Sequence, residues 1–227
     1  ANSSSYSITV YPADGDRRPN PIITIGGAKT KLVIPQGIAV DSAGNIYVAN
    51  EGILNSDPAS VTIYRAGDNG DVAPIARISG PKTGLNRPDA LALDTHGFIY
   101  VANQIDSPKA PYRITVYAPH SNGDAAPVRT IAGPATGLSE PGGLAVDSAG
   151  NLFVTSAQNE KQYCCSAAVL IYAPGATGNV APIASIDGDC GRLHASGAIA
   201  LGANGNIYVT DPAAPMPEGV FVYGWQD

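Results

Sequence analysis

The pattern GIAVDSAGNIYVAN at residues 37–50 recurs along the whole chain and constrains its fold more than any other feature. Each copy reads as two short apolar strands around a tight turn, which closes with Gly and in three copies opens with Asp. Asp accepts hydrogen bonds from its own backbone in such turns, and Gly adopts positive φ at no steric cost. The pattern therefore predicts a β-hairpin. The other copies lie at 90–103, 143–156 and 198–211.

Two further apolar runs accompany each hairpin. One ends in a tyrosine, as at 61–64, and these tyrosines recur about every 53 residues. The other follows a proline, as at 74–79. No segment has helical spacing of its apolar residues over a useful length, so each period contains four short strands. The tyrosines are Tyr11, Tyr64, Tyr117, Tyr172 and Tyr223, and the prolines are Pro21, Pro74, Pro127 and Pro182.

Four antiparallel strands in a period of this length are typical of a β-propeller blade. In the first complete repeat we expect strands A, B, C and D at 37–41, 45–50, 61–64 and 74–79. Strand A is rich in Ala and Gly, which suits the innermost strand of a blade. The recurring aromatic residues of strands B and C are expected to pack between blades rather than to form a ligand platform.

The repeat has a specific counterpart among known families. The pattern P-x-G-[IL]-A-[VL]-D-x-x-G-N-[IL]-[YF]-V-[AT]-[ND], followed by a V-x-[VI]-Y strand, resembles the NHL-repeat family of β-propellers, and most of all its bacterial extracytoplasmic kind. The resemblance covers nearly the whole chain. It implies an all-β propeller of four-stranded antiparallel blades. It does not imply one function, because propellers of this family include binding scaffolds, lyases and lactonase-like hydrolases.

The predicted strands do not fill whole blades. We expect about four blades: three complete ones, and one assembled from the N- and C-terminal strands, with one C strand left over. Two arrangements remain open, a ring closed within one chain and strand complementation between chains into a ring or filament. The complete blades are expected at 37–80, 90–133 and 143–188, and the terminal strands at 7–12, 21–26, 198–202, 206–211 and 219–224.

We interpret the chain as a single domain, 1–227. Its repeats are expected at about 7–60, 61–113, 114–168 and 169–218, with a terminal strand at 219–224.

Charge excludes some partners. Charged residues are 14% of the chain and the formal net charge is −6. Nucleic-acid binding requires clustered Lys and Arg, and the densest basic pair here is Arg17-Arg18. No apolar run reaches the roughly 18 residues of a membrane span. We therefore expect neither nucleic acid as a partner nor a membrane span.

The first residues and the cysteines indicate an oxidising compartment. The chain opens with Ala-Asn-Ser-Ser-Ser, which is typical of a mature end after signal-peptide removal or of a cloning boundary. Cys164 and Cys165 lie in a long loop between strands B and C, and Cys190 lies in the next loop between strands D and A. Because these loops emerge on one face of a propeller, a disulfide between Cys165 (or Cys164) and Cys190 is predicted. We expect a secreted or cell-surface protein; the alternative is a cytosolic protein with three reduced thiols.

In enzymes of this architecture the site lies at the channel mouth, where loops enter strand A and leave strand B. A metal cage requires several carboxylates or histidines around one point, and these positions provide two scattered aspartates, so no metal or cofactor is expected. Neither a G-x-S-x-G motif nor paired histidines occur, so no catalytic residue is assigned; of the three histidines, His194 merits a test. The candidate binding residues are Gln36, Asn50, Asp89, Asn103, Ser156 and Asp211.

These observations favour a non-enzymatic, secreted or cell-surface propeller that serves as an interaction or self-assembly module. Its expected partner is itself, as a homo-oligomer or filament, or another extracellular protein, bound through an added strand and loop contacts. One alternative is a metal-dependent lactonase- or lyase-like enzyme at the channel mouth. Another is a glycan-binding module, although no aromatic residue outside the strands recurs once per blade.

Overall fold

The computed structural model describes residues 1–13, 20–53, 56–104, 111–157, 167–187, 197–211 and 220–224, and the structural statements below concern these residues. The chain divides into two compact units. Unit 1 consists of Ala1–Pro88 and His120–Ala126, and unit 2 of Asp89–Pro119 and Pro127–Asp227.

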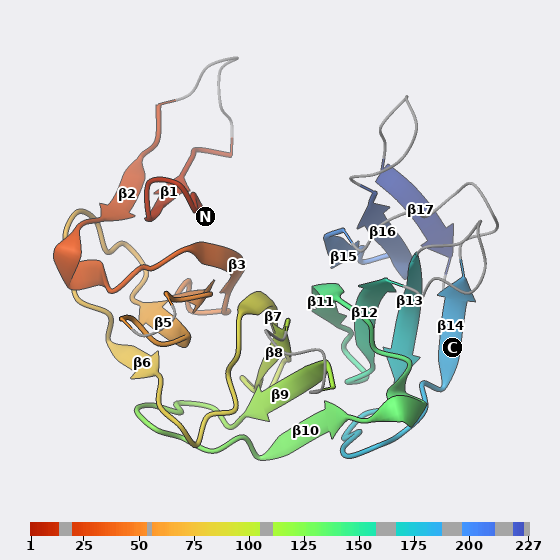
Figure 1. The fold of residues 1–227 in the computed structure, drawn as a ribbon. Coiled ribbons are helices and arrows are strands. Elements are labelled where there is room, and N and C mark those ends of the chain that lie inside the picture. The colour runs from red at the N-terminus through yellow and green to blue at the C-terminus, as the bar shows by residue number, and fades with distance from the viewer. Residues whose placement is uncertain are drawn as a thin grey trace. The chain divides into compact units, whose positions relative to one another are not determined.

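Unit 1 contains a two-stranded and a four-stranded antiparallel sheet (Figure 1). The small sheet pairs β1 with β2, and the larger one has the order β3-β4-β5-β6. The strands are β1 (Ser7–Val10), β2 (Ile23–Gly26), β3 (Pro35–Val40), β4 (Ile46–Asn50), β5 (Ser60–Tyr64) and β6 (Ala76–Ile78).

Unit 2 contains two four-stranded sheets, β7 to β10 and β11 to β14, and a three-stranded sheet, β15-β16-β17. The first sheet consists of β7 (Pro88–Leu93), β8 (Ile99–Asn103), β9 (Arg113–Tyr117) and β10 (Arg129–Ala132). The second consists of β11 (Pro141–Val146), β12 (Leu152–Ala157), β13 (Ala167–Tyr172) and β14 (Ala184–Asp187). The third consists of β15 (Ile199–Leu201), β16 (Asn206–Thr210) and β17 (Val220–Gly224).

The predicted fold class is confirmed: the chain is an all-β, four-bladed propeller built from antiparallel blades in the order A, B, C, D. We call the sheets β3–β6, β7–β10 and β11–β14 blades one, two and three, and the sheet β15–β17 blade four. Of the two candidates for the surplus C strand, β17 pairs with β16, and β1 pairs with β2. Helix among the described residues is limited to two short 3-10 turns, η1 (Ala28–Thr30) and η2 (Pro134–Thr136), so no described helix is long enough to cross a membrane.

The predicted A–B hairpins form as expected. In blade one the turn is closed by the backbone amide of Asp41, which donates to the carbonyl of Asn45, and by the amide of Gly44, which donates to the carbonyl of Asp41. Strand D differs slightly from the prediction, because it begins two residues after its proline. In blade one it begins at Ala76 rather than Pro74, since proline has no amide hydrogen to give to the ladder.

The core lies between blades. Along β12, Leu152 and Val154 face blade two, whereas Phe153 faces blade four, as the two-residue period of a strand requires. The C-strand tyrosines Tyr64 and Tyr172 are fully buried. Each hydroxyl donates a 2.6 Å hydrogen bond to a backbone carbonyl in the 3-10 turn before its blade, that of Thr30 or Thr136. The predicted packing role of these tyrosines is therefore confirmed.

Neighbouring repeats are also joined through their backbones. Strand D of one repeat forms a parallel bridge to the loop between strands C and D of the next, first at Ile25 with Gly70 and again at Ile78 with Gly123 and at Ile131 with Gly178. A side chain from the same loop reinforces each bridge. In unit 1 the Asp71 carboxylate accepts from the Lys29 amide at 2.7 Å. We call this recurring contact the repeat clasp.

Candidate functional site

Each blade has two ends that differ in chemistry. At the loop end, strand A begins and strand B finishes, and the predicted ligand residues lie there. At the turn end lies the hairpin turn that joins strand A to strand B.

Asn50, the last residue of β4, is fully buried and ties the loop before strand A to the sheet. Its Oδ1 accepts from the Val33 amide at 3.2 Å. Its Nδ2 donates to Thr62 Oγ1 at 3.0 Å and to the Val48 carbonyl at 3.2 Å. These bonds give Asn50 a structural role at the loop end of blade one.

The equivalent residues of the other blades are also buried. Asn103 Nδ2 donates to Thr115 Oγ1 at 3.1 Å, as Asn50 does in blade one. Ser156 Oγ accepts from the Ser139 amide at 2.8 Å and lies 2.9 Å from the Ser139 carbonyl. Asp211 in blade four is 3% exposed. Ligand binding at these four positions stays a prediction.

Glu51 follows Asn50 directly, and its carboxylate is held by two side chains of unit 1. Arg87 Nε donates to Oε1 at 2.8 Å in an ion pair, and Gln36 Nε2 donates to Oε2 at 3.1 Å. The Glu51 side chain is 23% exposed, so water can reach it. Of the predicted residues, Gln36 is thus brought into a polar cluster with two charged groups, which we call the Glu51 cluster.

Unit 2 repeats part of this arrangement with donor and acceptor exchanged. Asp89 holds the position of Gln36 and Gln104 holds the position of Glu51, and Gln104 Nε2 donates to Asp89 Oδ2 at 3.2 Å. The sequence reasoning identified Gln36 and Asp89 but missed Glu51, Arg87 and Gln104. The available signal was positional, since Glu51 and Gln104 directly follow the recurring B-strand asparagines.

The described part of the chain does not offer a metal cage. No group of three or more His, Cys, Asp or Glu side chains there lies close enough together to hold an ion. One carboxylate beside an amide, as in Asp89 with Gln104, falls short of the several oxygen or nitrogen ligands that a divalent cation takes. The residues that the structure describes therefore do not fit the metal that a lactonase-like function implies.

At the turn end, the recurring aspartates organise their own hairpins. Asp41 Oδ1 accepts from the Ala43 amide at 2.9 Å and the Asn45 amide at 2.8 Å, and Oδ2 accepts from Asn45 Nδ2 at 2.8 Å. Partial burial alone would raise the pKa of Asp41, but these hydrogen bonds, with one from the Tyr47 hydroxyl, lower that pKa below its ordinary value. The charged turn is thus a structural element.

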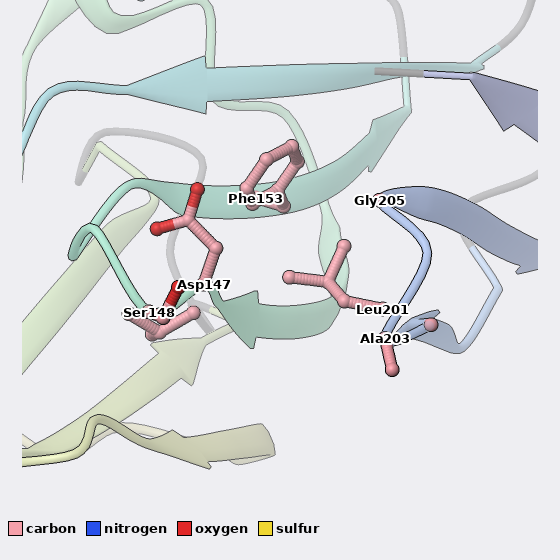
Figure 2. Close-up of a pocket in the computed structure, with 8 residues that line it drawn as sticks. Asp147, Ser148, Phe153, Leu201, Ala203 and Gly205 are labelled. Carbon is pink, nitrogen blue, oxygen red and sulfur yellow. The ribbon is translucent and has the colours of Figure 1, made fainter. Parts of the chain in front are cut away.

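A pocket of about 540 Å³ opens at the turn ends of blades three and four (Figure 2). Asp147, Ser148 and Phe153 contribute from the β11–β12 hairpin, and Leu201 and Gly202 contribute from the β15–β16 hairpin. The pocket combines one carboxylate with an aromatic ring and an aliphatic side chain. None of these residues was predicted as a site residue.

Of the remaining candidates that the structure describes, His96 lies outside these sites. His96 lies exposed in the β7–β8 turn, where its amide donates to Asp94 Oδ1 at 2.9 Å. Cys164, Cys165, Cys190 and His194 fall outside the described residues. The predicted disulfide therefore stays a prediction.

Comparison with known proteins supports the architecture. A family model described as a beta-propeller repeat matches residues 23–49. No curated protein matches the chain in sequence. Among solved structures, one described provisionally as a gluconolactonase is 16% identical with a TM-score of 0.53, and the match covers 90% of this chain and 63% of that one.

Two lyases also match, more weakly. Streptogramin B lyase has a TM-score of 0.41 at 15% identity, with 86% of this chain and 55% of that one covered. Virginiamycin B lyase from Staphylococcus aureus has a TM-score of 0.35 at 11% identity, with 84% and 55% covered. The chain thus spans less than two thirds of the length of each of these structures. At these identities the likeness shows the fold.

The functional expectation from sequence needs correction. We expected a non-enzymatic interaction and self-assembly module, possibly a filament. The match to a propeller described provisionally as a gluconolactonase contradicts that expectation and leaves the enzymatic alternative as a proposal. The Glu51 cluster was not predicted because it forms from neither recurring nor metal-type residues and combines side chains from separate loops.

Proposed function

We propose that the chain is a hydrolase that opens small cyclic esters, with the Glu51 cluster as its reactive centre. The observation that carries this proposal is a partly exposed carboxylate held between the Gln36 amide and the Arg87 guanidinium at the loop end of blade one. The fold likeness to a protein described as a gluconolactonase supports the substrate class.

The chemistry follows from the carboxylate. Glu51 takes a proton from a water molecule as the water oxygen bonds to the acyl carbon of the ester, which is general base catalysis. The ring carbon–oxygen bond then breaks, and the proton passes from Glu51 to the leaving alkoxide. The products are a hydroxy acid and a regenerated carboxylate, so atoms and charge balance.

The neighbours of Glu51 have distinct roles in this scheme. Gln36 fixes one carboxylate oxygen by its 3.1 Å hydrogen bond and thereby orients the other toward Arg87. Arg87, whose side chain is 43% exposed, carries a guanidinium at the rim that attracts the negative charge developing on the acyl oxygen. No step passes through a metal.

Three finer expectations belong with this proposal. We propose that the repeats are of the NHL kind, supported by the motif at residues 37–50 and its recurrences. We propose an extracytoplasmic location, supported by the placement of the three cysteines in the sequence. Partners also remain proposals, namely a second copy or another extracellular protein; each is testable by secretion assays and by solution mass.

The test is a hydrolysis assay. The purified chain is incubated with a panel of sugar-derived lactones, and proton release is followed against buffer alone. The wild-type chain is expected to accelerate at least one lactone. Glu51→Gln keeps the shape and the hydrogen-bonding oxygen but loses the base, so its kcat should fall by about a hundredfold or more.

Glu140→Gln is the matched control. Glu140 is an exposed carboxylate in the loop before β11, and its contact is the Tyr112 hydroxyl at 3.4 Å, outside the Glu51 cluster. This variant should keep wild-type kcat. Absence of any hydrolysis by the wild-type chain, or an unchanged rate in Glu51→Gln, would overturn the proposal.

A further inference from the structure

The turn end of blade two contains a partly buried guanidinium that has no counterpart in blade three. Arg129 extends from β10 across its own blade, and its Nη2 donates to the Tyr100 hydroxyl at 3.0 Å. Its guanidinium carbon lies 5.1 Å from the centre of the Phe98 ring and 5.7 Å from that of Tyr100. The Tyr100 hydroxyl in turn donates to Asp94 Oδ2 at 3.4 Å. A cation, an aromatic ring and a turn aspartate thus form one chain of contacts.

Strand register identifies the equivalent positions in blade three. Across blade two, Tyr100 pairs with Val116, and Val116 pairs with Arg129. Across blade three, Phe153 pairs with Ile171, and Ile171 pairs with Ala184. Residues in such register lie on one face of a sheet. Ala184 therefore stands where blade two has Arg129, and Phe153 stands where it has Tyr100.

The space that Arg129 fills in blade two is open in blade three. The gap lined by Tyr100, Arg129 and Gly150, between blades two and three, is closed to a water-sized sphere. The corresponding gap between blades three and four is the pocket of about 540 Å³ beside Phe153 and Gly205. At this register position blades one and three have alanine, Ala76 and Ala184, and blade two alone of the three has a long cationic side chain.

The pocket keeps part of the surroundings that the cation has in blade two. The turn aspartate and one of the two rings have counterparts, whereas Asn151 stands at the position of Phe98 and Phe153 lacks the hydroxyl of Tyr100. Figure 2 shows the Asp147 side chain beside the Phe153 ring, with Leu201 across from them, and all three line the pocket. Asp147 accepts from the amide and the side chain of Asn151, both at 2.8 Å. Phenylalanine has no hydroxyl, so it cannot give Asp147 the third bond that Tyr100 gives Asp94. The carboxylate keeps acceptor capacity toward the pocket.

We propose that this pocket binds a guanidinium or ammonium group carried by a small molecule, in the place that Arg129 occupies one blade earlier. Asp147 supplies the charge, the Phe153 ring supplies a face or edge for the cation, and Leu201 packs against the carbon chain that carries it. The site lies at the turn end in unit 2, whereas the Glu51 cluster lies at the loop end in unit 1. The proposal is independent of the hydrolase proposal.

The experiment uses N-methylguanidinium as the probe and N-methylurea, its neutral isostere, as the control ligand. Backbone amide shifts of the full chain are followed by NMR as each is added. N-methylguanidinium should give saturable shifts at Phe153, Leu201 and Gly202, and N-methylurea should not. Equal effects of the two ligands, or no saturable shift with N-methylguanidinium, would overturn the proposal without recourse to any variant.

Two variants test the assignment of roles. Ala184→Arg introduces the internal guanidinium of blade two and should abolish binding of the probe while keeping the fold. Asp147→Asn should weaken binding about tenfold or more, because a charge-assisted hydrogen bond is lost. The matched control is Asp41→Asn, which makes the same change in an equivalent turn of unit 1 and should leave binding unchanged. Undiminished binding in Ala184→Arg would place the probe elsewhere and sink the proposal.

Discussion

The hydroxyl of Tyr64 donates a 2.6 Å hydrogen bond to the carbonyl of Thr30, which lies 34 residues earlier in the chain. Both residues are fully buried. The bond fixes the loop that leads into strand A onto strand C of the same blade. That loop ends beside Gln36, so a core contact helps to place the Glu51 cluster.

Removing this hydroxyl should destabilise the chain. Tyr64→Phe leaves the Thr30 carbonyl buried without its donor, and we expect the free energy of unfolding to fall by about 1–2 kcal/mol. Urea denaturation followed by circular dichroism measures the change. Tyr11→Phe is the control, because Tyr11 holds the same position in its repeat but is 52% exposed. It should change stability by less than about 0.5 kcal/mol; equal losses in both variants would contradict the interpretation.

Alkaline pH should unfold the chain through the same tyrosines. Burial raises the pKa of Tyr64 and of Tyr117 from 10.0 to about 12. A raised pKa in the folded state means that stability is complete below pH 10 and is lost as pH rises toward 12, since only the unfolded chain ionises in that window. Near-ultraviolet absorbance should show these phenols ionising together with the loss of circular dichroism. Their ionisation in the intact fold near pH 10 would contradict the prediction.

Acid should weaken the turn of blade one. The pKa of Asp41 is lowered in the folded state, so its contribution to stability is present above its unfolded value of about 3.8 and is lost as pH falls through the folded value. Unfolding free energies measured between neutral pH and pH 2 should fall more steeply for wild type than for Asp41→Asn, which cannot be protonated. Parallel pH profiles would show that the carboxylate does not stabilise this turn.

Two glycines separate backbone strain from steric clash. Gly80 and Gly123 both have positive φ, at 138° and 63°. A Cβ at Gly80 would lie 2.4 Å from Asp124 Oδ1, which holds the Lys82 amide, whereas a Cβ at Gly123 meets nothing within 4 Å. Gly80→Ala should therefore lower the unfolding free energy by at least about 1 kcal/mol more than Gly123→Ala. Thermal denaturation measures the stability of both variants. An equal loss of stability would mean that the positive φ, and not the contact with Asp124, sets the effect.

The B-strand end of blade one should tolerate serine better than alanine. Asn50→Ala removes bonds to Val33 and Thr62 inside the protein and should cost about 2 kcal/mol of unfolding free energy. Asn50→Ser provides the group that Ser156 uses at the equivalent position of blade three. It should cost less than alanine in the same urea titration. A larger loss with serine would show that a serine at this position cannot hold the loop before strand A in blade one as Ser156 does in blade three.

The fold was predictable because its signals repeat. The hairpin motif, the C-strand tyrosine and the D-strand proline each recur once per period, so chance agreement is excluded by their spacing. The expected strand B of blade one, 45–50, differs from β4 (Ile46–Asn50) by one residue. The burial of Tyr64 followed from the need to pack bulky side chains between sheets.

The candidate sites were less predictable because they depend on departures from the repeat. Glu51 and Arg87 are paired only once the loops around Pro35 and Pro88 take their paths, and nothing in their spacing indicates the contact. The pocket at Asp147 lies in a blade that has the short side chain of Ala184 where blade two has Arg129. This difference is found only by comparing the strand registers of the two blades. The motifs that recur in every repeat predict the fold, whereas the candidate sites are formed by residues that differ between repeats.

The repeat clasp has a consequence for how such a chain can change length. Each clasp joins the fourth strand of one period to a loop of the period after it, as Ile131 joins Gly178. If one whole repeat is inserted or deleted, every strand D still meets the C–D loop of a following repeat, wherever the repeat boundary is placed. Gain or loss of half a period leaves a strand facing a loop that cannot receive it. The gene for such a protein can grow and shrink only in whole steps.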